Sequence, residues 1–196
     1  MKKLILTMAI LVGFVVSAQA FTITKVGSVK SAEYNDLMDK FYKKEVGVWA
    51  GVDPDGYHYV EFKFDGGLKD LEVGLWQPTD DTPSSLYGYL KWEGVLAKAI
   101  EWGDVAKTNQ VDHSATIGDC SNNDIKCKAR FTSISNGETV YVTFDLEDKE
   151  NQFYKAEPII MLEDIRMLND IFMTKVPAHW KKVREQATKD TSNLFN

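Results

Sequence analysis

The stretch Val46-Gly-Val-Trp-Ala-Gly-Val-Asp-Pro-Asp-Gly-Tyr-His-Tyr-Val-Glu-Phe-Lys-Phe64 carries the clearest β pattern in this chain. Two runs rich in β-branched and aromatic residues, 46–52 and 57–64, flank Asp53-Pro-Asp-Gly56. Because proline fixes φ and glycine accepts a positive φ, these four residues favour a tight turn. The stretch therefore predicts a β-hairpin. We expect residues 71–76 to add a third strand and extend the hairpin into a meander.

A second hairpin is expected later in the chain. Ser135-Asn-Gly137 separates two alternating runs, 128–134 and 139–146, and Asn-Gly in such a position is the strongest short-range hairpin signal. Residues 21–26 alternate more weakly, and we expect a short strand there. These segments together predict an antiparallel sheet of about five to six strands built from two hairpin regions.

Two further segments have helical patterns. Ser31 suits an N-cap, and the apolar residues after it recur at a spacing of three to four, which predicts a helix over 32–45. Those apolar residues are Tyr34, Leu37, Met38, Phe41 and Tyr42. Residues 82–102 favour a helix, since Thr82 and Pro83 suit its start. Its glycines leave a strand over 86–92 as the alternative. The expected helix buries one face made of Tyr89, Trp92, Leu96 and Ile100.

The last fifth of the chain is expected to be helical. Pro158 suits a first helical turn, and an apolar stripe follows it, made of Leu162, Ile165, Leu168 and Phe172. Pro177 should stop or kink this helix, because proline lacks the N–H that the helix needs. A shorter amphipathic helix follows. The overall expectation is an α+β fold, with the sheet packed by an N-terminal helix and by C-terminal helices.

Residues 1–20 have the three parts of a secretory signal peptide. Lys2 and Lys3 supply the positive start, Leu4 to Val16 the apolar run, and Ala18-Gln-Ala20 the small-residue cleavage site. The apolar run is shorter than the ~20 residues that a membrane-spanning helix needs. We therefore expect cleavage at about Ala20, a periplasmic or secreted protein without a stable membrane anchor, and a single domain over 21–196.

Charge restricts the classes of partner. The whole chain has a formal net charge of −6, and removing Lys2 and Lys3 with the signal peptide makes it −8. An acidic surface disfavours nucleic acid, whose phosphates need Lys and Arg, and it disfavours adsorption to anionic membranes. A basic protein is the partner that this charge favours. The sequence contains no pattern for a cofactor.

The two cysteines, Cys120 and Cys127, both follow the signal peptide. In an oxidising compartment two such thiols normally pair, so we expect a structural disulfide that closes a ring of eight residues. A redox role would favour Cys-x-x-Cys, and a zinc site would need a second pair of ligands at suitable spacing. Neither pattern is present, and no metal site is expected.

Catalytic candidates are few. His58 lies on the more apolar side of its expected strand and is best explained as a core-edge residue with one hydrogen bond. His113 follows Asp112 and precedes acidic loop residues, and this arrangement could support a general base. His179 is expected to be a surface or packing residue. Asp80 and Asp81 could act as paired carboxylates, although adjacent acids more often cap and solvate a following helix.

Aromatic residues are unusually frequent between 49 and 102. Tyr57 and Tyr59 share one strand face with Glu61, and exposed aromatic residues on a sheet suit ligand stacking or a protein hot spot. We therefore expect a non-enzymatic binding or inhibitor-type protein that acts through an acidic, aromatic-bearing surface. A small hydrolase that uses the carboxylates or a histidine is the alternative, and a passive envelope or stress protein is another.

Overall fold

The computed structural model describes residues 21–35, 38–65, 70–78 and 88–193. Within these ranges the chain has the α+β fold with an antiparallel sheet that its sequence predicts. No helix in the described part of the chain is long and apolar enough to cross a membrane. In chain order the elements are β1 (Ile23–Asn35), β2 (Lys40–Val52), β3 (His58–Phe64), β4 (Leu71–Trp76), α1 (Gly88–Asn109), β5 (His113–Asp119), β6 (Ile125–Ile134), β7 (Thr139–Asp148), β8 (Lys155–Ala156), β9 (Ile159–Met161), α2 (Leu162–Asp170), the π-helical turn η2 (Ile171–Lys175) and α3 (Val176–Asn193).

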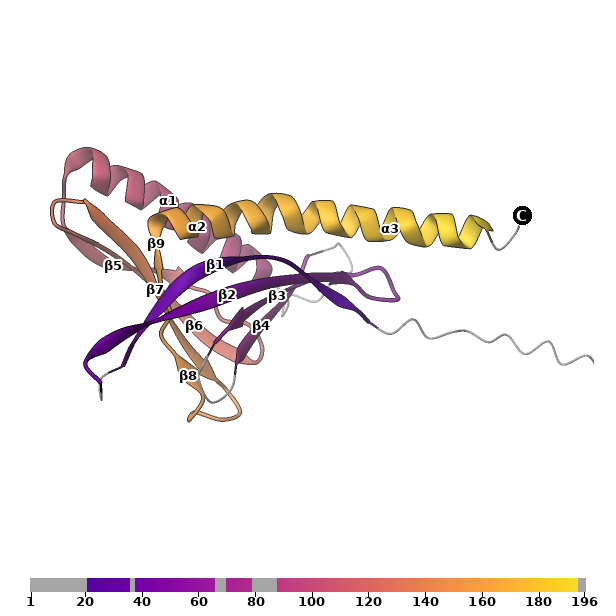
Figure 1. Cartoon of the computed structure of the whole chain (residues 1–196), viewed down its shortest axis with the longest axis horizontal. Helices are drawn as coiled ribbons and strands as arrows, with labels where there is room; N and C mark the ends of the chain where they lie inside the picture. Colours follow the sequence, from indigo (N-terminus) through magenta and orange to yellow (C-terminus); the bar gives the residue numbers. More distant parts are fainter. Residues whose placement is uncertain (1–20, 36–37, 66–69, 79–87, 194–196) are drawn as a thin grey trace, which may run out of the picture.

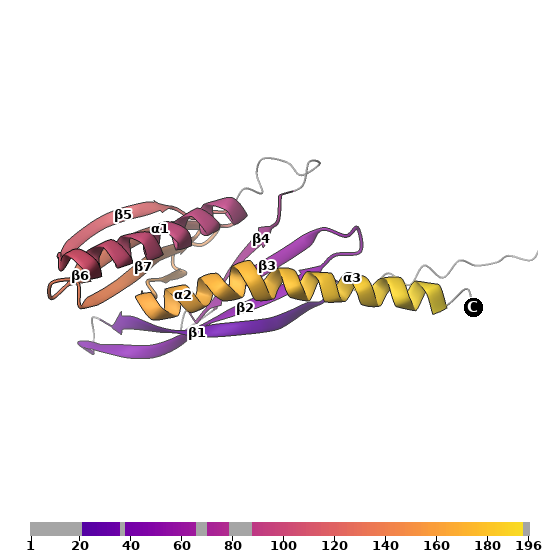
Figure 2. The same ribbon diagram turned by 90° about the horizontal axis from the view of Figure 1, so that it is seen from above.

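The strand order is β4-β3-β2-β1-β9-β7-β6-β5, and β8 pairs with β7 outside this path. Strands β1 to β4 form a first meander and β5 to β9 a second, and the two join where Ala32 pairs with Ile159. The helices lie on one side of the sheet (Figures 1 and 2). Helix α1 follows the first meander but packs mainly on β5, β6 and β7, whereas α2 and α3 pack on β1 and β2. The helix that follows the first meander therefore covers the second meander, and the helices that follow the second meander cover the first.

The core lies between the sheet and the helices. Alternate residues of each long strand point into it, which is the period of two that a sheet with one buried face requires. Trp92 of α1 is at the centre, stacked on Phe144 with ring centroids 5.0 Å apart and packed on Phe62 at 4.6 Å. The inward residues are Val46, Val48 and Ala50 of β2, Val60, Phe62 and Phe64 of β3, Leu71, Val73 and Leu75 of β4, Ala129 and Phe131 of β6, and Val140, Val142, Phe144 and Leu146 of β7.

Both predicted hairpins are confirmed. Strands β2 and β3 pair from Val46 with Phe64 to Val52 with His58. In the turn between them, the backbone N–H of Tyr57 donates to the side chain of Asp53 over 2.7 Å, and Gly56 has a φ of +88°. Strands β6 and β7 pair over ten residues each, around the predicted Ser135-Asn-Gly137 turn. Turn chemistry was therefore a sound guide to the local pairing.

The helix predicted over 32–45 is wrong, because residues 32–35 belong to β1 and residues 40–45 to β2. Ser31, the expected N-cap, is a buried residue of β1. Tyr34 pairs with Phe41 across the two strands. The spacing of these two residues suits one face of a helix, but in the structure they face each other as a cross-strand pair next to a turn. The side chain of Phe41 is exposed, which means that its periodic position reflects no buried helix face. The pairing of β2 with β1 overrides the local helical pattern.

The sheet is also larger than predicted: the described residues contain nine strands instead of five or six. Strand β5 was missed because it lies at a sheet edge and is mostly polar, with Ile117 as its buried residue. Strands β8 and β9 have two and three residues, too few for an alternating pattern. The helix predicted over 82–102 is confirmed from Gly88 onward and continues to Asn109, whereas residues 79–87 lie outside the described ranges.

The C-terminal helical region passes through Pro177 instead of ending there. The π-helical turn lies just before Pro177, and the backbone N–H of Val176 donates to the carbonyl of Ile171. A proline in a continuous α-helix lacks one hydrogen bond and collides with the carbonyl four residues back. The wider turn lies where the ring of Pro177 would otherwise meet the carbonyl of Met173, and the helical region continues into α3.

Candidate functional site

Three aromatic rings gather on the face of the first meander that is opposite the helices. Phe21 packs against Tyr59 and Trp76, with ring centroids 5.2 and 5.9 Å away. Tyr59 and Trp76 are paired residues of β3 and β4, and their centroids are 4.8 Å apart. Phe21 is 44% exposed. We call these three residues the aromatic cluster.

Gly74 of β4 lets the ring of Tyr59 lie flat on the sheet. A Cβ atom at this position would come within 2.2 Å of the Tyr59 hydroxyl oxygen and 2.9 Å of Cζ. Such distances are shorter than any tolerable contact, so the close approach of the ring depends on the missing side chain. A glycine that weakens a strand by its lack of packing often marks such a close approach.

The hydroxyl of Tyr59 donates a hydrogen bond of 2.7 Å to Oε2 of Glu61. Glu61 is only 6% exposed, and its other oxygen, Oε1, lies 3.0 Å from Nζ of Lys63. This contact is an ion pair without well-directed hydrogen-bond geometry, since Oε1 has no hydrogen bond to the described residues. Lys63 also pairs with Glu72 at 2.8 Å and lies over the ring of Trp49 at 5.1 Å. A buried carboxylate is tolerated only with such partners.

The electrostatic surroundings of Tyr59 are acidic. Burial raises the pKa of its hydroxyl, and the hydrogen bond to Glu61 raises the pKa further, followed by the charges of Glu61, Glu72 and Asp124. The hydroxyl therefore stays protonated and acts as a donor at any physiological pH. Asp124, from the loop between β5 and β6, lines a small pocket together with Trp76 of the aromatic cluster. Three carboxylates from separate parts of the sequence thus act on one hydroxyl.

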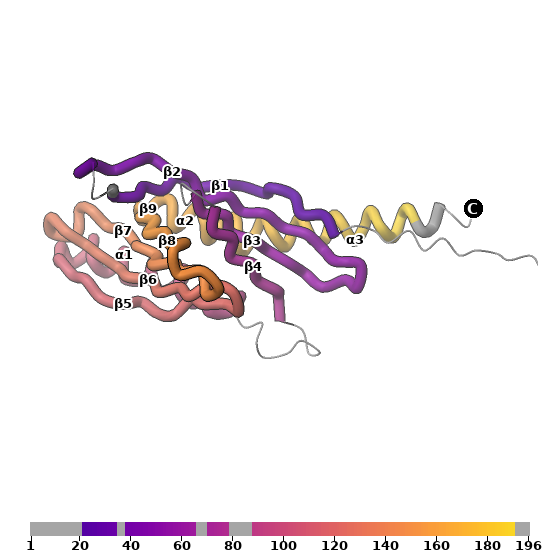
Figure 3. Tube along the Cα trace, turned by 90° about the horizontal axis from the view of Figure 1, so that it is seen from below, coloured from indigo at the N-terminus to yellow at the C-terminus, as the bar shows by residue number. Residues whose placement is uncertain are grey.

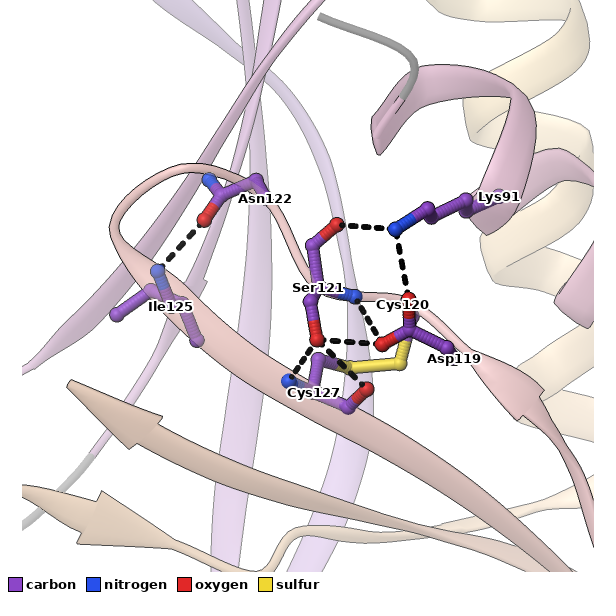
Figure 4. The surroundings of a disulfide bond; sticks show 7 residues. All are labelled: Lys91, Asp119, Cys120, Ser121, Asn122, Ile125 and Cys127. Carbon is purple, nitrogen blue, oxygen red and sulfur yellow. Dashed lines mark hydrogen bonds and ion pairs between the residues drawn. A yellow bond between two sulfur atoms is a disulfide. The ribbon is translucent and has the colours of Figure 1, made fainter. Parts of the chain in front are cut away.

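The predicted disulfide links Cys120 to Cys127 at the base of that loop, with Cα atoms 4.8 Å apart and both residues buried. Figure 4 shows how side chains hold the loop. Asp119 accepts a 2.6 Å hydrogen bond from Lys91 and others from the backbone N–H and hydroxyl of Ser121. Burial raises the pKa of Asp119, but these hydrogen bonds outweigh it and lower the pKa to about 2.

Asn122 connects the disulfide loop to the edge strand β4. Its Oδ1 accepts hydrogen bonds from the backbone N–H groups of Asp124 and Ile125, and its Nδ2 donates to the carbonyl of Gly74 over 2.8 Å. A small pocket of about 60 Å³ lies at this junction, lined by Trp76 and by the exposed residues Asn123 and Asp124, among others. The loop therefore forms one rim of the surface that carries the aromatic cluster.

Of the predicted binding-face residues, the structure leaves Tyr57 exposed, half-buries Tyr59 and buries Glu61. Whether they bind a partner stays a prediction. Sequence reasoning did not connect them with Phe21 or Trp76, whose positions depend on the pairing of distant strands. The alternation of 71–76 would have placed Trp76 on the outward face, but not its register against Tyr59.

The three histidines lie apart from this surface. Nδ1 of His58 is 2.5 Å from Oε1 of Gln77, and the ring stacks on Trp180 at 4.5 Å, as expected for a core-edge residue. Burial lowers the pKa of His58 and of His179, and the nearby cations Arg184 and Lys182 contribute to the two shifts. His113 is exposed, with its ring edge-on to Trp102.

The acidic residues considered for His113 have other hydrogen-bond partners or lie at the far end of the strand. Asp119 lies at the opposite end of β5, and Asp112 accepts a hydrogen bond of 2.6 Å from the backbone N–H of Asn136. Asp80 and Asp81 fall outside the described residues. No group of three or more His, Cys, Asp or Glu side chains within the described ranges could hold a metal ion. Comparisons with protein-family models, curated proteins and solved structures gave no match to this chain.

Proposed function

We propose that this chain is an exported, non-enzymatic binding protein of the inhibitor type, whose binding surface is the aromatic cluster with its acidic rim. The partner is a protein that presents Lys or Arg side chains. The observation that carries the proposal is that the aromatic cluster, with Phe21 exposed, shares its sheet face with Glu72, while Asp124 lies beside Trp76 at the pocket on the edge of that face. Aromatic residues dominate protein hot spots, and their rings attract cations.

The rigidity of this surface supports the proposal. Tyr59 is held by Gly74 beneath it and by Glu61 beside it, and the loop that carries Asp124 is closed by the disulfide and by Asn122. A surface whose side chains are already fixed loses little entropy on binding. Export is part of the same proposal. The disulfide suits an oxidising compartment, and cleavage after Ala20 would leave Phe21 of the cluster as the first residue.

An affinity experiment with the mature chain tests this proposal. Envelope extract is passed over three immobilised baits: the wild-type chain, Trp76→Ala in the cluster, and Met167→Ala at an exposed position of α2 on the other side of the sheet. We expect one protein to be enriched on the wild type and on Met167→Ala and depleted on Trp76→Ala. The same protein should elute at raised ionic strength, because salt screens the contacts between carboxylates and cations.

Two outcomes would count against the proposal. The first is that no protein is enriched over an unrelated acidic domain of matched charge. The second is equal enrichment on Trp76→Ala and on the wild type while the variant retains the melting temperature of the wild type. That result would place any binding surface elsewhere on the molecule.

A further inference from the structure

One large side chain anchors helix α3 on the first meander. Trp180 is only 2% exposed, and its Nε1 donates a 3.0 Å hydrogen bond to the backbone carbonyl of Tyr59 in β3. From Lys181 to Asp190 the residues of the helix are exposed, apart from the half-buried Val183. Figures 1 and 3 show the last turns of α3 extending past the end of the β2–β3 hairpin. Beyond its first turn, the docking of α3 therefore depends mainly on Trp180.

The ring of His58 in β3 packs directly on this anchor. It stacks on the indole of Trp180, with centroids 4.5 Å apart and an angle of 9° between the planes. Nδ1 of His58 lies 2.5 Å from Oε1 of Gln77. Because an amide oxygen only accepts hydrogen bonds, Nδ1 carries the proton of the neutral ring. Nε2 is buried and has no hydrogen-bond partner among the described residues.

Protonation makes this position of the ring costly. The neutral ring leaves only a lone pair of Nε2 unpaired, whereas the protonated ring would bury an unpaired N–H that carries positive charge. An indole face attracts cations, but stacking on Trp180 does not supply the acceptor that this N–H needs. The charged ring is therefore better accommodated where water reaches it, which requires the contact with Trp180 to open.

The charges around the ring also disfavour its protonation. Lys181, Arg184 and Glu185 of α3 line a pocket of about 270 Å³ beside it. Glu185, the acid among them, lies 4.0 Å from Nζ of Lys181, and Arg184 repels a charged His58. Burial lowers the pKa of His58, the hydrogen bond with Gln77 partly offsets this effect, and the charge of Arg184 lowers the pKa again.

We propose that the contact between His58 and Trp180 is a pH-sensitive switch: when His58 takes up a proton under mildly acidic conditions, α3 undocks from the first meander more readily. The sign follows from proton linkage. The docked helix favours the neutral ring and holds the pKa of His58 below its ordinary value of 6.5. The docking free energy is therefore complete above about pH 6.5 and decreases as the pH falls below this value. This inference goes beyond the proposed function and does not depend on it.

Hydrogen exchange of the mature, disulfide-bonded chain tests the inference. The exchange of residues 176–184 is measured by mass spectrometry at pH 7.5 and at pH 5.5 and corrected for the intrinsic rate at each pH. We expect the opening constant to rise about two- to tenfold, the upper figure holding if His58 takes up its proton only in the open form. The opening constant of α1 should stay unchanged. An equal rise in α1 would show general acid destabilisation and overturn the inference.

Two variants identify the histidine that is responsible. His58→Gln keeps a neutral polar side chain and should remove the rise. His179→Gln is the matched control, because His179 also lies in α3 and burial lowers its pKa as well. This second variant should keep most of the rise. A rise that persists in His58→Gln, or that disappears only in His179→Gln, would overturn the inference.

A second readout needs no change at His58. The NMR signals of its ring, followed through a pH titration of the wild-type chain, should give a midpoint below 6.5. Arg184→Gln should raise this midpoint, because the variant removes the cation that repels the charged ring. A wild-type midpoint at or above 6.5 would overturn the inference even if His58→Gln did not fold.

Discussion

Replacing Gly74 by alanine should destabilise the protein, although the same change in most strands is favourable. The new Cβ would lie 2.2 Å from the hydroxyl oxygen of Tyr59, and ordinary contact begins near 3.4 Å. The ring must therefore move by about 1 Å, which separates the hydroxyl from Glu61. Because Glu61 is only 6% exposed, water cannot fully replace the lost donor.

The expected magnitude follows from two opposing effects. Losing a hydrogen bond to a buried charged group costs about 1.5–3 kcal/mol. Removing a glycine from a strand stabilises by about 0.5–1 kcal/mol. We therefore expect Gly74→Ala to lower the free energy of unfolding by about 1–2 kcal/mol. Urea denaturation of the mature, oxidised chain measures this quantity, and the slope of the transition should stay unchanged.

A matched control and a second background make the prediction specific. Gly94 lies in α1 with open space where its Cβ would be, so Gly94→Ala should stabilise by up to about 1 kcal/mol. In a Tyr59→Phe background the hydroxyl is absent, and Gly74→Ala should cost about 1 kcal/mol less than in the wild type. Equal stability of Gly74→Ala and the wild type, or an identical loss in both backgrounds, would refute the reasoning.

Three further predictions concern the disulfide loop and export. Reducing the bond between Cys120 and Cys127 should lower the free energy of unfolding by about 2.5 kcal/mol, the chain-entropy value for an eight-residue ring, measured by urea denaturation with and without reductant; an unchanged midpoint would contradict this. Asp119 has a lowered pKa of about 2, so its stabilising effect is present above the ordinary value of 3.8 and is lost as pH falls from about 4 towards 2. The difference in melting temperature between the wild type and Asp119→Asn should shrink over that range, and a difference that grows on acidification would exclude the pairing with Lys91. Finally, intact-mass measurement of the exported protein should show a chain that begins at Phe21 without free thiols, and a retained initiator methionine would contradict export.

Much of the local structure could be predicted from short stretches of sequence. The turns at Asp53-Pro-Asp-Gly56 and Ser135-Asn-Gly137 depend on backbone preferences of their own residues, and both hairpins form as expected. Similarly, the apolar face of α1 around Trp92 was visible in its spacing. The disulfide followed from having two cysteines in a segment expected to be exported. In each case the deciding interactions lie within about ten to twenty residues.

The candidate site is different, because it joins residues from four separate segments. Phe21 reaches Tyr59 only because β1 pairs with β2 and β2 with β3, and Trp76 meets Tyr59 only in the observed register of β4. A shift of one residue would turn Trp76 into the core. The alternation within each strand defines the two faces of the sheet. Which of these faces stays open to solvent depends on where α2 and α3 pack.

The sequence by itself determined the turns, the alternation of the long strands, the buried side of α1 and the pairing of the cysteines, since these depend on local backbone chemistry or on having no other partner. Tertiary structure alone decided that residues 32–35 and 40–45 form paired strands and not a helix, and that α1 covers the second meander while α2 and α3 cover the first. It also decided that a π-helical turn carries the chain through Pro177. The physical reason is that these features depend on burying whole faces of the sheet at once. The free energy gained by this burial depends on several segments together and is not contained in the sequence of any one of them.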